Sequence, residues 1–289
     1  MTVHFRYATY ALALCLFLIF APATSASAQI RYVTGQDVAP AFEGWERNPD
    51  GTFSMVFGYL NRNWEEEVDI PIGPNNTVDP GGDRGQPTHF YTRRQRFVFK
   101  VVVPKDWDKN KKVVWTLTSH GRTDVAKGWL QPEWEMNLGV FSENSGGGVL
   151  EEGNQPPSIT GPPAQTVTLP NTLTLTVSAT DDGLPKPRPR RPRPDAATAA
   201  PAPNLNPDTP PRRPEGLRIK WIQYRGPGKV TFDPDNAPAV YGKPVALTTT
   251  VSFSAPGTYL LRAIGSDGQL EARHEVTVTV NPGASAQNR

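Results

Sequence analysis

The sequence predicts an all-β protein built of two β-sandwich domains. Three observations lead to this fold class. Bulky and polar residues alternate along most of the chain, turn-forming residues interrupt the alternation, and no long run repeats its apolar residues with a helical period. Alternate side chains of a strand point to opposite faces, so these runs indicate half-buried strands. The length of 289 residues exceeds that of one sandwich domain, which indicates two.

Residues 1–28 have the order of a secretory signal. The basic residues His4 and Arg6 precede an apolar run at 11–20, and a small-residue cleavage site follows at 26–28. We therefore expect the chain to be exported to the periplasm, the cell surface or the medium. The apolar run is shorter than the about 20 residues of a membrane span, so we expect no transmembrane span in the mature chain. A retained N-terminal anchor is the alternative.

Cys15 is the only cysteine, and it lies within the predicted signal. The mature chain would then form no disulfide and no thiolate metal site. Its length suffices to bury a core without such cross-links. The formal net charge of +2 gives no global field that would attract nucleic acid, so an electrostatic partner requires a local patch.

The first sandwich is predicted over residues 29–144. Turn-forming stretches at 48–51, 73–76 and 79–82 separate its alternating runs. The residues that mark its strands are Phe53, Met55, Phe57 and Tyr59, then Phe97, Phe99, Val101 and Val103, and then Val113, Trp115 and Leu117. The stretch at 58–67 is similar to parts of uncharacterised exported bacterial proteins, a resemblance that implies no activity.

A glycine-rich linker is predicted at 145–153, since its residues offer nothing to bury. The second sandwich follows at 154–282, and 283–289 is a tail. A compact turn at 265–268 is expected to join its last two strands. The residues that mark its strands are Leu173, Leu175 and Val177, then Leu217, Ile219 and Trp221, then Tyr259, Leu261 and Ala263, and then Val276, Val278 and Val280.

This second half resembles the bacterial immunoglobulin-like extracytoplasmic domains, including the PKD-like and cadherin-like repeats. The stretches that carry the resemblance are Asn154-Gln155-Pro156-Pro157, the residues 178–183, and the residues 255–259 leading to 266–268. The resemblance implies an immunoglobulin-like sandwich with Trp221 buried at its centre and Tyr259 in a tyrosine corner. The run after Trp221 departs from the PKD type, and the linker motif of true cadherins is absent.

A proline- and arginine-rich insert at 184–216 interrupts the second sandwich and is expected to be extended or disordered. Its exposed cations could bind an anionic polymer, an envelope polysaccharide or a membrane surface. The alternative is a solvated spacer. No nucleic acid is expected, because base-stacking aromatic residues are not interleaved with the cations. The candidate residues are Lys186, Arg188, Arg190, Arg191 and Arg193.

Three carboxylates fall at loop ends of the second sandwich. Asp181, Asp182 and Asp267 could hold a structural Ca²⁺ through hard oxygen ligands, and Asn154 could add a carbonyl oxygen. The alternative is that Asp181-Asp182-Gly183 and Ser266-Asp267-Gly268 are ordinary turns, in which aspartate caps its own backbone. No other cofactor is expected.

The first domain is rich in tryptophan. Exposed indole rings could form a platform for sugar rings, and Trp64, Trp107 and Trp134 are the candidates because polar residues flank them. The alternative is that most of these rings fill the core of a sandwich without disulfides.

The sequence supplies no catalytic candidate that outweighs a structural interpretation. Glu65 and Glu67 would share one face of a strand while Glu66 points to the other, which does not oppose two carboxylates across a cleft. A site combining His89 and His120 is a weaker hypothesis. Nucleophile-elbow, P-loop and dinucleotide motifs are absent from the sequence. We therefore predict a non-enzymatic exported binding or structural protein of the cell envelope; the alternative is a carbohydrate-binding module or weak carbohydrate-active hydrolase.

Overall fold

The computed structural model describes residues 32–187 and 216–283. The described residues belong to one compact unit that begins at Tyr32. The predicted secretory signal, the arginines of the insert and the last residues of the tail lie outside the described ranges. Within these ranges, no helix is long and apolar enough to cross a membrane.

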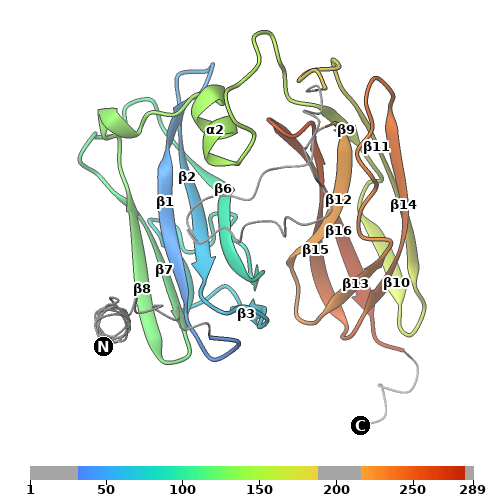
Figure 1. Ribbon diagram of the computed structural model, residues 1–289. Helices are drawn as coiled ribbons and strands as arrows, with labels where there is room; N and C mark the ends of the chain where they lie inside the picture. Colours follow the sequence, from blue (N-terminus) through green and yellow to red (C-terminus); the bar gives the residue numbers. More distant parts are fainter. Residues whose placement is uncertain (1–31, 188–215, 284–289) are drawn as a thin grey trace, which may run out of the picture. The chain divides into compact units, whose positions relative to one another are not determined.

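The first sandwich consists of short antiparallel sheets (Figure 1). One three-stranded sheet has the order β1-β2-β6, another has the order β4-β7-β8, and β3 pairs with β5. The strands are β1 (Val38–Arg47), β2 (Phe53–Asn61), β3 (Val68–Asp69), β4 (Asn76–Asp79), β5 (His89–Phe90), β6 (Arg93–Val103), β7 (Val113–Ser119) and β8 (Arg122–Gly128). Alternation predicted β2 and β7 correctly, and it predicted β6 correctly except at Phe97, which lies in a bulge.

Aromatic rings fill the core of this first sandwich. Trp115 is completely buried and packs edge-on against Phe57 and Phe99, while Phe90 stacks on it at 6.3 Å between ring centroids. The indole N–H of Trp115 donates to Asn76 Oδ1, so its polar atom is satisfied inside the core. This packing explains how the sandwich reaches a dense core without a disulfide.

The second sandwich has the strand pairing of the immunoglobulin fold. One sheet has the order β13-β14-β11-β9 and the other the order β10-β16-β15-β12. In chain order these correspond to the ABED and CFG sheets of that fold, with β10 added beside the last strand. The strands are β9 (Ser158–Thr160), β10 (Gln165–Thr168), β11 (Leu173–Thr180), β12 (Arg218–Arg225), β13 (Val230–Asp233), β14 (Val245–Phe253), β15 (Gly257–Ser266) and β16 (Glu271–Asn281). The predicted class, all-β with two sandwiches, is thereby confirmed.

Two residues that the resemblance singled out occupy the expected places. Trp221 is buried, and Phe232 stacks on it with an angle of 10° between the rings. Tyr259 is also buried, and its hydroxyl donates to the carbonyl oxygen of Ala255 at 2.7 Å. A tyrosine hydroxyl bonded to the backbone a few residues upstream is a tyrosine corner, so that prediction is confirmed.

The sequence pattern did not indicate two features of the first half. A 3-10 turn, η1 (Pro132–Trp134), and a short helix, α2 (Leu138–Asn144), follow the last strand. The side chain of Asn137 caps α2 by accepting from the backbone N–H of Val140. In addition, β6 bulges opposite Gly58, and Phe97 within the bulge has a φ of 53°. The ring of Phe97 leaves the main core and packs on Phe141 of α2.

Hydrogen bonds join residues of the two sandwiches at the β6 bulge. Arg262 and Arg273 both donate to the carbonyl oxygen of Val98, and Arg273 also donates to that of Phe97. Nearby, the backbone N–H of Gln223 donates to the hydroxyl of Tyr91. The bulge therefore presents backbone carbonyls that the guanidinium groups of β15 and β16 satisfy.

The glycine-rich segment after α2 is held in place rather than left without contacts. The side-chain amide of Gln269 donates to the carbonyl oxygen of Val149, and its oxygen accepts from the backbone N–H of Glu151. At Gly147 an added Cβ would lie 2.7 Å from the Cα of Gln269, so only glycine permits this approach. The turn after β15 therefore anchors the segment that connects the two sandwiches.

Candidate functional site

Four pieces of chain meet at one end of the second sandwich. Asn154 ends the connecting segment, Asp181 and Asp182 follow β11, and Asp267 opens the turn between β15 and β16. Asn154 and Asp267 are both almost completely buried. The side chain of Asn154 lies against the Asp267 carboxylate, whose negative charge also acts on Asp181. The structure thus brings together the residues that the sequence placed in separate loops.

Hydrogen bonds fix how the side-chain amides of Gln269 and Asn154 are oriented. The side-chain N–H₂ of Gln269 donates to Val149, so the Gln269 oxygen must be the acceptor on the other side. That oxygen accepts from the Asn154 side-chain N–H₂ at 2.9 Å. The amide nitrogen of Asn154 is therefore held by the Gln269 oxygen.

Three buried oxygen atoms at this place find no hydrogen-bond donor in the described part of the chain: Asn154 Oδ1, Asp181 Oδ1 and Asp267 Oδ2. The other oxygen of each carboxylate accepts hydrogen bonds from backbone N–H groups. Asp181 accepts from the N–H of Gly183, and Asp267 accepts from those of Gln269 and Leu270. Buried acceptors without a donor are costly, and either a proton or a cation would relieve the cost.

Burial raises the pKa of Asp181 to about 6, and the nearby charges of Asp267 and Asp182 act in the same direction. Burial also raises the pKa of Asp267, although backbone hydrogen bonds oppose this change. Both carboxylates therefore hold their negative charge less readily than an exposed aspartate. A bound divalent cation would reverse this effect by stabilising the charged forms.

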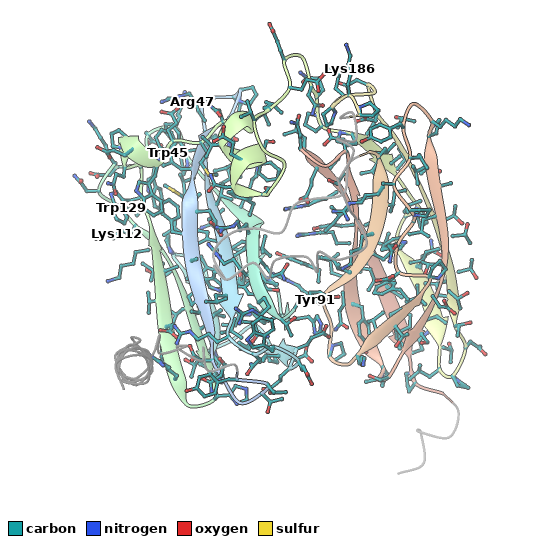
Figure 2. The ribbon with its side chains drawn as sticks, in the orientation of Figure 1. Trp45, Arg47, Tyr91, Lys112, Trp129 and Lys186 are labelled. Carbon is teal, nitrogen blue, oxygen red and sulfur yellow. The ribbon has the colours of Figure 1, made fainter. Side chains whose placement is uncertain are left out.

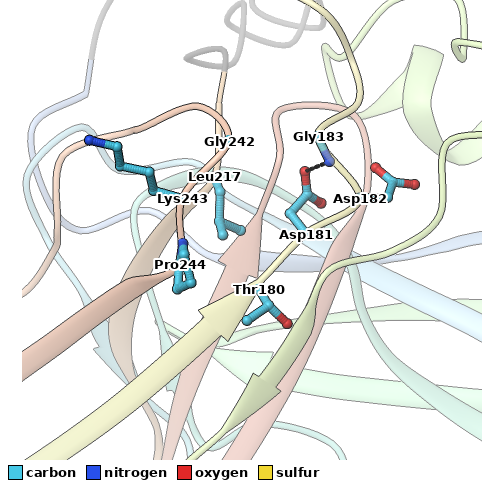
Figure 3. Close-up of a pocket in the computed structure, with 8 residues that line it drawn as sticks. All are labelled: Thr180, Asp181, Asp182, Gly183, Leu217, Gly242, Lys243 and Pro244. Atoms are coloured by element: carbon cyan, nitrogen blue, oxygen red, sulfur yellow. Dashed lines mark hydrogen bonds between the residues drawn. The ribbon is translucent and has the colours of Figure 1, made fainter.

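A cavity of about 220 Å³ adjoins the two carboxylates that follow β11 (Figure 3). Leu217 and Pro244 form part of its wall, and the Lys243 side chain points away from Asp181 and Asp182. Among the described residues, no group of three His, Cys, Asp or Glu side chains is placed to hold a metal ion. The set at this place instead consists of two carboxylates and one amide oxygen, which is the hard-oxygen chemistry that suits Ca²⁺.

Asp182 differs from the other two aspartates. Its two oxygen atoms accept from the backbone N–H groups of Leu184 and Gln155, and the residue is exposed. It therefore ties the start of the insert to the segment that precedes β9. Gln269, which sequence reasoning did not single out, is the residue that orients Asn154; no sequence signal marks it beyond its place in the turn.

The three candidate tryptophans lie apart from this cluster. Trp134 is 42% exposed and stacks on Phe42 with an angle of 8° between the rings. Trp64 is 40% exposed, and the guanidinium of Arg93 lies 4.2 Å from its ring centroid. Trp107 is half-buried, with the Lys111 ammonium 4.2 Å from its ring. Trp134 thus combines an exposed ring with stacking on another aromatic side chain.

Trp129, which was not a sequence candidate, extends the aromatic group around Trp134. Its ring is nearly parallel to that of Phe42, with 6.4 Å between centroids, and the Lys112 ammonium lies 5.3 Å away on the surface (Figure 2). Trp45, in contrast, is buried and donates its indole N–H to the Gln131 carbonyl. The tryptophans thus divide between core and surface.

The acidic and histidine residues considered for catalysis form structural contacts. His89 lies between Asp69 and Glu67, at 2.8 Å and 3.3 Å. Burial lowers its pKa, but the hydrogen bonds to Asp69 and Glu67 outweigh burial and raise the pKa to about 9. His120 pairs instead with Glu66, whose other oxygen accepts from the N–H of Gly35. The two histidines thus belong to different acid–base contacts.

The basic insert is described only at its start. The backbone N–H of Lys186 donates to the Glu151 carboxylate, which holds this residue near the connecting segment. Arg188, Arg190, Arg191 and Arg193 lie outside the described residues. Their role in binding a polyanion stays a prediction.

Comparisons with known proteins give no family. No family model matches the chain, and no curated protein matches it. Similar solved structures include a PKD domain from human KIAA0319, with 15% identity over 47% of this chain and 92% of that chain, at a TM-score of 0.22. The S-layer protein SbsC domains 4 and 5 match with 11% identity over 85% and 98%, at 0.26. Fibronectin(III)-like modules of Clostridium thermocellum CbhA match with 11% identity over 88% and 97%, at 0.24. At these scores the likenesses carry no argument, so the fold description rests on the strand order.

Proposed function

We propose that this chain is an exported, non-enzymatic binding or structural protein of the cell envelope. The observation that carries the proposal is that its histidine side chains form contacts with neighbouring carboxylates and backbone groups. His89 is held by Asp69 and Glu67, and His274 contacts the carbonyl oxygen of Pro162. Side chains engaged in this way stabilise loops and strand ends, which is the use expected of a binding scaffold rather than of a reaction centre.

The binding proposal is tested by capture from an envelope extract at physiological salt. The immobilised forms are the chain from Gln29 onward, which is the predicted mature form, and a variant lacking 187–215. A component retained by the first form and lost with the insert would assign binding to the basic segment. Retention by both forms would assign it to the sandwiches. Failure of both forms to retain anything would contradict the binding version.

We further propose that Asn154, Asp181 and Asp267 hold a structural Ca²⁺. The support is the set of three buried oxygen atoms that lack a donor among the described residues, together with the orientation that Gln269 imposes on Asn154. Two carboxylates would balance the charge of the ion. Asp182, which the sequence placed in the same set, has both oxygens occupied by backbone donors and would support the loop instead. The stretch at 154–157 also supports membership of the second sandwich among PKD-like modules.

A carbohydrate-binding role is the second candidate function. It is favoured by the exposed Trp134 ring, which lies nearly parallel to Phe42, a ring on which Trp129 also stacks. Rigid aromatic faces of this kind bind the apolar faces of sugar rings at low entropic cost. Binding on a glycan array that Trp134→Ala abolishes and Trp107→Ala retains would support this role. Absence of binding to any glycan on the array would contradict the carbohydrate-binding role.

A further inference from the structure

Two outer strands meet along one side of the first sandwich (Figure 1). β1 is an outer strand of the sheet β1-β2-β6, and β8 is an outer strand of the sheet β4-β7-β8. The two strands contact each other, whereas their backbone ladders run to β2 and β7. At Gly128, the last residue of β8, an added Cβ would lie 2.6 Å from the ring of Phe42 in β1. We call the contact between these strands the β1–β8 seam, and side chains must hold it together.

Asp37, which directly precedes β1, lies at the other end of the β1–β8 seam. Its side chain is only 5% exposed, and its Oδ1 lies 3.2 Å from a terminal nitrogen of Arg62 and 3.8 Å from one of Arg122. The backbone N–H of Arg62 donates to the carbonyl oxygen of Asp37. The N–H of Val38 donates to the hydroxyl of Ser119, at the end of β7. These contacts fix the position of the Asp37 carboxylate.

The side chain of Asp124, in β8, is hydrogen-bonded to that of Asp37. We call these two residues the acid pair. Asp37 Oδ2 and Asp124 Oδ2 are both buried, and no donor group reaches either atom among the residues that the structure describes. An ionised carboxylate can only accept hydrogen bonds, so two carboxyl groups can bond to each other only when one of them carries a proton. Two ionised groups here would repel each other and would leave buried acceptors unsatisfied.

We propose that Asp37 and Asp124 share one proton, which holds β1 against β8 until rising pH removes it. The hydrogen bond to Asp37 and burial raise the pKa of Asp124. A raised pKa means that the stabilisation is fully present below the ordinary aspartate value and is lost as pH rises through the raised value. The β1–β8 seam is therefore a pH-sensitive contact. The proposal does not depend on what the chain binds.

Two cations face the acid pair. Arg62 follows β2 and Arg122 begins β8, and their positive charges lower the pKa of Asp124 without cancelling the opposite effect of the hydrogen bond. The nearby turn between β7 and β8 carries His120, whose Nε2 lies 3.1 Å from Glu66 Oε1. Protonation of His120 therefore acts on Glu66 in the first place. The two arginines keep their charge over the whole range in which carboxyl groups titrate, so the proton of the acid pair is the group that changes.

The first test is a titration of the carboxyl carbons by NMR, using the chain from Gln29 onward without any substitution. Because the two groups are coupled, we expect the signals of Asp37 and Asp124 to shift together as one proton leaves the pair. This step should lie above about pH 3.9, the ordinary aspartate value. Independent ionisation of both groups at or below that value would overturn the proposal.

The second test compares the wild type with Asp124→Asn. The asparagine N–H₂ can donate to Asp37 without a titrating proton, so the contact is kept at every pH. We expect the urea midpoint of the wild type to fall more than that of the variant as pH rises from acid to neutral. The titrations of His89 and Asp181 occur in both proteins and cancel in the difference. Parallel pH profiles of the two proteins would overturn the proposal.

Asp108→Asn is the matched control for this comparison. Asp108 is exposed, and its side chain accepts from the backbone N–H of Asn110. The substitution removes the same charge as Asp124→Asn but leaves the acid pair intact. We expect the control to keep the pH dependence of the wild type. A control profile as flat as that of Asp124→Asn would show that net charge causes the difference, and would overturn the proposal.

Discussion

At the scale of single residues, the position of His89 between two carboxylates links stability to pH. Its pKa is about 9 in the folded chain, against about 6.5 when unfolded. The raised value means that the stabilisation is fully present below pH 6.5 and is lost as pH rises toward 9. We expect the free energy of unfolding to fall by up to about 3 kcal/mol across this window.

Chemical denaturation at a series of pH values measures this change, with His89→Gln as the comparison. Glutamine can still donate one hydrogen bond but does not titrate. The variant should therefore be less stable at pH 6 and should show little further loss toward pH 9. A slope equal to that of the wild type would show that other groups cause the pH dependence.

The buried oxygen atoms near Asp267 lead to a prediction for cation binding. Thermal melting of the wild type should shift upward with Ca²⁺ and downward with a chelator, because a ligand that binds only the folded chain stabilises it by about 2.7 kcal/mol at a hundred times its dissociation constant. Asp267→Asn should lose the response. Asp182→Asn, whose side chain only caps backbone groups, should keep it. Equal shifts of the melting temperature in both variants would contradict the proposed Ca²⁺ site.

Asp181 adds a pH signature to the same site. Its pKa of about 6 lies above the ordinary aspartate value of 3.8, so the protonated form stabilises the fold at low pH. In the presence of chelator, the stabilisation of the fold by protonated Asp181 is fully present below pH 3.8 and is lost as pH rises through 6. Saturating Ca²⁺ should remove that loss, since the cation replaces the proton. Melting curves at pH 4 to 7, with and without Ca²⁺, check this expectation, and parallel profiles would contradict it.

At the scale of elements, the bulge of β6 depends on the forked shape of arginine. The two terminal nitrogens of Arg273 donate to the carbonyl oxygens of Val98 and Phe97. A lysine ammonium keeps the charge but cannot place two donors in that fixed geometry. We expect Arg273→Lys to lower the free energy of unfolding by about 1 to 3 kcal/mol, measured by urea denaturation. Arg84 donates in the same forked way to the carbonyl oxygens of Pro80 and Val102, so Arg84→Lys should also lower the free energy of unfolding. An unchanged free energy of unfolding in Arg273→Lys would contradict the role of the fork at the bulge.

Elements differ in how well the sequence predicts them, for physical reasons. The run from Val276 to Val280 alternates strictly, and β16 buries its valines. Phe97 to Val103 alternates just as strictly, yet Phe97 turns away because its positive φ belongs to a bulge that depends on Arg273 and Gly58. The helix α2 has only seven residues, too few to show a helical period.

The candidate site was predicted in part. Asp181 and Asp267 could be named because aspartate beside glycine marks loop ends, and loops at one end of a sandwich lie together. The different role of Asp182 could not be predicted, because it depends on the backbone N–H groups of Gln155 and Leu184. The aromatic pair of Phe42 and Trp134 likewise joins residues far apart in sequence.

At the scale of the whole molecule, two dense cores and a held connecting segment form one compact unit beginning at Tyr32. The central claim is that this unit acts by binding. The most direct measurement is quantitative capture from envelope extract at physiological salt with Ca²⁺ present, using the native chain and the same chain after heat unfolding. The account predicts a component that the native chain retains and the unfolded chain does not. Equal retention by both, or retention of nothing by the native chain, would contradict it.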